Sequence, residues 1–190
     1  MNLIANIFVF LVIALTTGLS TAWYFVEASS GFSPDRTGAW YSWSRDGRAS
    51  ANPYTRANIA RSGRLPVMAK SMLYYTTSHD SDGRVIDAEC DYMIIGKDPH
   101  AIWWSISAYD GSGRLMDNPA IRHTYNASNV MRAPDGQFQI SLSTNPAPGN
   151  WLPVDSDYKV RLILRMHRRV ADTNSSGALT LPEIRRTACR

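Results

Sequence analysis

The sequence lacks the motifs that mark most enzymes and nucleotide-binding proteins. It contains no Gly-x-Ser-x-Gly elbow, no His-Glu-x-x-His motif and no glycine-rich phosphate loop, and its four histidines are dispersed. Nucleophilic, zinc-protease and phosphate-transfer chemistry therefore have no recognisable motif here. Long runs of one charge are also missing, because 20 Lys and Arg are mixed with 16 Asp and Glu. Nucleic acid is accordingly not expected as a partner, and no cofactor is predicted.

Charge is absent from the N-terminal segment, where the first charged side chain is Glu27. Residues 1–26 are almost continuously apolar and long enough to cross a bilayer as a helix. We interpret this segment as an uncleaved transmembrane anchor. A cleaved signal peptide is the alternative, because Ser20-Thr-Ala22 is an acceptable cleavage site.

Cysteine is scarce, which excludes a disulfide-rich scaffold, and the two cysteines form no C-x-x-C motif. In an oxidising compartment, a long-range bridge between Cys90 and Cys189 would tie the C-terminal tail to the body of the domain. Two buried free thiols are the alternative. Together with the N-terminal helix, the bridge predicts an exported domain on a membrane anchor.

The remainder is predicted to be a linker followed by one mainly β domain. Residues 27–50 are rich in Ser, Gly and Arg and are expected to form a juxtamembrane linker, from which Trp40 and Trp43 pack onto the domain. In residues 51–190 a short helix is expected from Asn52, with Gly63 just past its end. The period then becomes two, and short runs rich in β-branched and aromatic residues predict strands within 71–78, 88–96, 102–109, 121–130, 138–144 and 158–167. Asp-Gly turn signals separate several of them, which predicts an antiparallel sandwich or jelly-roll-like domain.

The segment DTNSSGALTLPE at residues 172–183 nearly matches an EF-hand calcium loop. Its candidate ligands are Asp172, Asn174, Ser176 and Glu183. An EF-hand requires a helix that enters the loop, whereas the preceding residues alternate like a strand, and only two of the ligands are carboxylates. We therefore interpret the segment as a connection and predict no metal site. A calcium-stabilised structural module is kept as an alternative.

A second candidate site consists of Asp87, Glu89 and Asp91. On a strand, alternate residues share a face, so the three carboxylates would line one surface about 7 Å apart. This spacing is close to that of the two carboxyl groups of inverting glycosidases. The competing interpretation is a solvated face for the acids, because the same alternation directs Ala88, Cys90 and Tyr92 to the core.

Tryptophan provides a third candidate, since Trp103, Trp104 and Trp151 could stack on a sugar ring. Adjacent strand residues point to opposite faces, so one of the first two is expected in the core. Ordinary packing is the competing interpretation for all three.

Several segments between Asn52 and the C-terminus resemble one known family. They read NPYTRANIARSGRLPV, DGRVIDAECDYMIIG, IWWSISAYDGSGRLMDN, GNWLPV and YKVRLILRMH followed by LPEIRR. This combination is similar to the domain of unknown function 1214 family, in its short membrane-anchored bacterial form. The resemblance implies an all-β, jelly-roll-like domain and brings no established reaction or catalytic residues. In larger relatives a similar domain follows a domain of unknown function 1254, so the resemblance implies a protein with that domain as a candidate partner.

Together with the resemblance, these observations predict an envelope module anchored in the bacterial inner membrane, with its soluble domain facing the periplasm. It is expected to bind a protein or a glycan and not to catalyse a reaction. The alternative is an envelope hydrolase that acts on carbohydrate or lipid, with Asp87, Glu89 and Asp91 as its acid and base groups.

Overall fold

The computed structural model describes residues 3–27, 35–42, 53, 60, 72–99, 101–155, 159–167 and 180–190. The chain divides into two compact units. One comprises Met1–Pro34 and Arg45–Val67, and the other comprises Asp35–Ser44 and Met68–Arg190.

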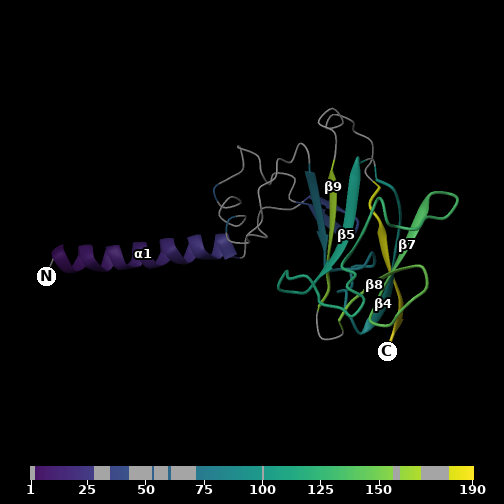
Figure 1. Cartoon of the computed structure of the whole chain (residues 1–190). Coiled ribbons are helices and arrows are strands. Elements are labelled where there is room, and N and C mark those ends of the chain that lie inside the picture. Colours follow the sequence, from purple (N-terminus) through teal and green to yellow (C-terminus); the bar gives the residue numbers. More distant parts are fainter. Residues whose placement is uncertain are drawn as a thin grey trace. The chain divides into compact units, whose positions relative to one another are not determined.

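The first unit contains the helix α1, Leu3–Glu27 (Figure 1). Its 25 residues correspond to about 37 Å of helix, which exceeds the roughly 30 Å hydrocarbon core of a bilayer. The helix also satisfies its own hydroxyl groups, since Thr16 and Thr21 donate hydrogen bonds of 2.8 Å to the carbonyl oxygens of Val12 and Thr17. The stretch Leu3–Tyr24 is therefore long and apolar enough to cross a membrane.

The second unit contains a six-stranded antiparallel sheet, called the large sheet, in the order β1-β2-β3-β9-β5-β6. Its strands are β1 (Asp35–Thr37), β2 (Trp40–Ser42), β3 (Met72–Thr77), β5 (Trp103–Tyr109), β6 (Thr124–Asn126) and β9 (Arg161–His167). β1 and β2 extend this sheet into the segment that the sequence assigned to a linker.

A four-stranded sheet, called the small sheet, has the order β10-β4-β7-β8. It consists of β4 (Cys90–Lys97), β7 (Gln137–Ser143), β8 (Asn150–Pro153) and β10 (Glu183–Cys189). β7 and β8 pair in parallel, whereas the other neighbours are antiparallel. The mainly β class and the antiparallel character are thus confirmed, with one parallel pair and no closed barrel. Jelly-roll topology stays a prediction.

The predicted alternation places the core between the two sheets, which form separate layers in Figure 1. Ile94 of β4, Ile140 of β7 and Leu164 of β9 are fully buried, and burial of each such side chain stabilises the fold by about 1.5–3 kcal/mol. Trp104 and Phe138 stack with ring centroids 4.8 Å apart. Each of the six sequence runs predicted as strands contains an observed strand. The helix predicted from Asn52 falls on residues of which only Pro53 and Ala60 are described, both of them helical.

Two turns with the pattern Asp-x-x-Gly-Arg, Asp80–Arg84 and Asp110–Arg114, have the same internal structure. In each, the aspartate carboxylate accepts a 2.8 Å hydrogen bond from the arginine amide, and the glycine has a φ of 85°, which L side chains rarely adopt. These turns follow β3 and β5, which pair with β9 from either side. Both turns therefore lie at the end of the large sheet where β9 begins.

Candidate functional site

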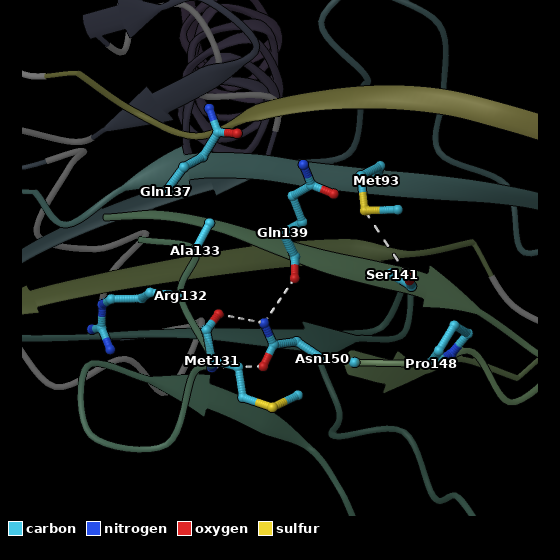
Figure 2. Close-up of a pocket in the computed structure, with 10 residues that line it drawn as sticks. Met93, Met131, Arg132, Ala133, Gln137, Gln139, Ser141, Pro148 and Asn150 are labelled. Carbon is cyan, nitrogen blue, oxygen red and sulfur yellow. Dashed lines mark hydrogen bonds between the residues drawn. The ribbon is translucent and has the colours of Figure 1, made fainter. Parts of the chain in front are cut away.

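A cavity of about 360 Å³ lies on the outer face of the small sheet. It is lined by Met93 of β4, by β7, by the segment 131–133 and by residues 148–150. Figure 2 shows these side chains around the hollow. The full lining is Met93, Met131, Arg132, Ala133, Gln137, Gln139, Ser141, Pro148, Gly149 and Asn150.

Strand alternation explains why β7 presents polar groups to this cavity. Its residues Phe138, Ile140 and Leu142 are buried in the core. The intervening residues Gln137, Gln139 and Ser141 must therefore point to the opposite face, where they line the cavity. The strand thus uses one face for stability and leaves the other available for contacts with a ligand.

Asn150 holds the wall of the cavity in place. Its side-chain amide donates hydrogen bonds of 2.8 Å to the carbonyl oxygens of Met131 and Gln139, and its oxygen accepts one of 2.8 Å from the Met131 amide (Figure 2). The residue is buried, so these bonds are shielded from water. Asn150 therefore joins β8 to β7 and to the segment 131–133.

The cation in the lining, Arg132, is already neutralised. Its guanidinium donates hydrogen bonds of 2.8 and 2.9 Å to the two carboxylate oxygens of Asp98. Partial burial raises the pKa of Asp98, but the hydrogen bonds from Arg132 and Trp104 outweigh this effect and hold the pKa below its ordinary value. The ionised Asp98 carboxylate balances the charge of Arg132, so the described lining residues leave no unbalanced charge beside the cavity.

The side-chain amides of Gln137 and Gln139 make no hydrogen bond with another residue that the structure describes. Each offers two N–H donors and one carbonyl acceptor. The Ser141 hydroxyl lies 3.9 Å from the Met93 sulfur, which is a weak acceptor. The cavity therefore combines unused neutral hydrogen-bonding groups with apolar contact surface from methionine and proline.

The three predicted carboxylates do not line one strand, so that expectation is wrong. The chain turns at residues 88–89, where the Cys90 amide donates to the Asp87 carbonyl oxygen at 3.1 Å. The Asp87 carboxylate accepts a hydrogen bond from the Glu89 amide within the same turn. Asp91 is on β4, and its carboxylate accepts a 3.2 Å bond from the Arg190 guanidinium. The competing prediction that Cys90 points to the core is confirmed.

The predicted calcium ligands Asp172, Asn174 and Ser176 lie outside the described residues. Glu183 begins β10 and forms a 2.7 Å ion pair with Arg185, whose guanidinium lowers the pKa of that carboxyl. In the described part of the chain, no group of three or more His, Cys, Asp or Glu side chains could hold a metal ion.

The two cysteines form the disulfide that the sequence predicted, which links the start of β4 to the end of β10.

Of the two adjacent tryptophans, Trp104 is in the core and Trp103 is 38% exposed, as alternation predicted. Trp151 donates a 3.1 Å hydrogen bond from its indole to the Ser143 carbonyl oxygen. The cavity was not predicted from the sequence. One signal for it was present, since the only two glutamines of the chain alternate on one predicted strand.

The fold is similar to two larger proteins of known structure. The VPA0106 protein from Vibrio parahaemolyticus is 26% identical with a TM-score of 0.60, and the match covers 76% of this chain and 37% of that protein. An uncharacterized protein from Burkholderia cenocepacia is 18% identical with a TM-score of 0.50, over 89% of this chain and 39% of its own. The chain therefore spans less than half the length of either relative. No curated protein matches it.

The family comparison agrees with the motifs found in the sequence. A family model described as protein of unknown function, DUF1214, matches residues 71–169 and so spans β3 through β9. Because this match covers more than half of the 190 residues, the chain belongs to the DUF1214 family.

Proposed function

We propose that the protein is a membrane-anchored envelope module that binds a neutral glycan in the cavity of the small sheet. The observation that carries this proposal is the pair of unused amides, Gln137 and Gln139, above an apolar lining in which the cation is neutralised. Sugar hydroxyls both donate and accept hydrogen bonds, so they match the mixed capacity of glutamine amides. A charged ligand would find no unpaired opposite charge among the described lining residues.

The setting of the domain supports an envelope location. α1 has the length and composition of a membrane anchor. The disulfide between Cys90 and Cys189 is typical of a protein in an oxidising compartment. An inner-membrane anchor with the β domain in the periplasm accounts for both features, and it places the cavity where envelope glycans are accessible.

The lining favours binding over hydrolysis. Glycosidases generally require two carboxyl groups on either side of the scissile bond. The described residues of the lining provide amides, a hydroxyl, thioethers and a paired guanidinium. These groups can orient a sugar but do not supply the acid and base pair that the chemistry requires.

The test is to screen the full-length chain in detergent micelles against an array of neutral and charged oligosaccharides, followed by calorimetry on the hits. The Gln137→Ala/Gln139→Ala variant should lose binding by about tenfold or more, which corresponds to two neutral hydrogen bonds. Asn145→Ala, an exposed amide outside the cavity, is the matched control and should bind normally. Equal binding by the double variant, or no neutral glycan bound at all, would refute the proposal.

A second candidate function, assembly with a separate chain, is favoured by the length comparison. This chain covers only 37% and 39% of its two larger relatives. The resemblance found in the sequence names a protein that contains a domain of unknown function 1254 as the candidate for that separate chain. Crosslinking in native membranes, followed by mass spectrometry, should recover such a protein with this chain, and its absence from the crosslinked products would count against assembly.

A further inference from the structure

The outer face of the large sheet carries two arginines of β9, Arg161 and Arg165. Its positions follow from the cross-strand register and from the buried alternate residues of β9, namely Leu162, Leu164 and Met166. We call it the basic face. On β3, β5, β6 and β9 it consists of Met72, Tyr74, Thr76, Arg161, Ile163, Arg165, His167, Trp103, Ser105, Ser107, Tyr109, Thr124 and Asn126, of which Ser105 and Ser107 are buried. None of these positions holds a carboxylate, whereas β9 alone contributes two arginines and a histidine.

The guanidinium of Arg165 is held between two aromatic rings. It lies 5.5 Å from the centroid of the Tyr109 ring and 6.0 Å from that of Tyr74, and it donates a 2.5 Å hydrogen bond to the Tyr109 hydroxyl. Both contacts fix the plane of the guanidinium. No described carboxylate pairs with it, so most of its N–H donors stay available in an orientation that is already set.

Arg161 lies four residues earlier on the same face, about 13 Å away along the strand. Its Nε is buried without a hydrogen-bond partner, and one of its terminal nitrogens reaches the Gly111 carbonyl oxygen at only 3.4 Å. It too makes no ion pair with a described carboxylate. The side chain is therefore under-satisfied and carries a positive charge that nothing described on this face balances.

The outer face of the small sheet provides the contrast. There Arg185 pairs with Glu183 at 2.7 Å, and Arg190 pairs with Asp91 at 3.2 Å. Mixed charges that pair with one another are usual for a solvated surface. The basic face departs from this pattern, so its charge is complementary to an anionic partner.

Two aromatic side chains add flat apolar surface to the basic face. Tyr74 is 37% exposed and is the cross-strand neighbour of Arg165. Trp103 is 38% exposed and is the cross-strand neighbour of His167. Partly exposed rings beside guanidinium groups suit a ligand whose units combine an anionic group with an apolar C–H face.

We propose that the basic face binds an acidic polysaccharide built from uronic acid units. Each uronic acid carries one carboxylate for a guanidinium and a pyranose ring face for stacking, so one unit satisfies both features of the surface. Arg161 and Arg165 bind carboxylates of the same chain, and Tyr74 and Trp103 pack against the sugar rings. This surface is independent of the neutral cavity, which lies on the other sheet.

The experiment measures binding of the full-length chain in detergent micelles to oligogalacturonate by calorimetry at several salt concentrations. Arg161→Gln/Arg165→Gln should lower the affinity at least about tenfold and reduce its salt dependence. Trp103→Ala should lower the affinity about fivefold without changing the salt dependence, because stacking is not screened by ions. Gln137→Ala/Gln139→Ala should bind oligogalacturonate normally.

The controls separate this proposal from general charge attraction and from misfolding. Arg165→Lys keeps the charge but loses the planar contact with both tyrosines, so it should bind more weakly than the wild type while its near-ultraviolet circular dichroism is retained. Polyglutamate of equal charge should bind at least about tenfold more weakly than oligogalacturonate. Equal affinity for polyglutamate would identify an acidic polypeptide as the partner and overturn the proposal, as would unchanged binding by the double arginine variant.

Discussion

The indole nitrogen of Trp40 donates a 2.6 Å hydrogen bond to the carbonyl oxygen of Pro182. Trp40 belongs to β2 of the large sheet, whereas Pro182 directly precedes β10 of the small sheet. The indole is 1% exposed and packs in the core between the sheets. One buried side chain therefore connects the N-terminal end of the β domain to its last strand.

Trp40→Phe should lower the free energy of unfolding by about 1–3 kcal/mol, because it leaves the Pro182 carbonyl buried without its donor. Trp40→Ala should lower it by about 3–5 kcal/mol, because a cavity is added. Denaturant unfolding followed by circular dichroism measures both changes. Wild-type stability in either variant would show that β2 does not pack on the small sheet as described.

Removal of the Cys90–Cys189 disulfide should lower the free energy of unfolding by about 2–5 kcal/mol. The bond joins residues separated by 99 positions, so the loop that it closes in the unfolded chain is long. The expected effect arises mainly from that closure. The reduced wild type and the Cys90→Ala/Cys189→Ala variant should therefore be destabilised to a similar extent. Denaturation with and without reductant measures this loss, and a wild type that is insensitive to reductant would contradict the expectation.

Strand periodicity identified the strands whose alternate residues are apolar. β4, β7 and β9 have one largely buried and one outward face, which is the pattern that alternation detects. β5 alternates in polarity from Trp104 to Ala108, although both of its faces are buried there. β10 escaped notice because only Ile184 is buried among its seven residues, and its pairing depends on β4 and on the disulfide. β1 and β2, with three residues each, are too short to show a period.

The candidate sites were harder to predict, because they depend on local turns and on cross-strand neighbours. A turn at Ala88–Glu89 separated the three acids, and no hydrophobic pattern encodes that turn. The cavity depends on residues 131–133 meeting Asn150 from a distant strand. Arg165 lies within the strand predicted at 158–167, but its two tyrosine neighbours became evident only from the structure.

The turn at Asp110–Arg114 should make stability depend on pH in the acidic range. A hydrogen bond from the Ser112 hydroxyl, followed by one from the Arg114 amide, lowers the pKa of Asp110 from 3.8 to about 2. Because this pKa is lower in the folded than in the unfolded protein, the stabilising contribution is complete above about pH 4 and is lost as the pH falls toward 2.

Melting temperatures recorded between pH 2 and pH 6 test this assignment. Asp110→Asn should reduce the decline in melting temperature below pH 4, because the residue no longer titrates. Asp117→Asn removes an exposed carboxylate from the same connection and serves as the control. An acid decline that is the same in Asp110→Asn and in the wild type would rule out this carboxylate as a contributor.

The Asn150 network should couple stability to the shape of the cavity. Asn150→Ala removes three hydrogen bonds of 2.8 Å, so it should lower the free energy of unfolding by about 2–3 kcal/mol. Because the amide also anchors residues 131–133, ligand binding in the cavity should weaken even where the variant is fully folded. Asn145→Ala, which removes an exposed amide, should change neither property. Unfolding measurements together with calorimetry on the folded variant distinguish these effects, and a destabilised variant with unchanged ligand affinity would mean that the segment 131–133 does not shape the binding site.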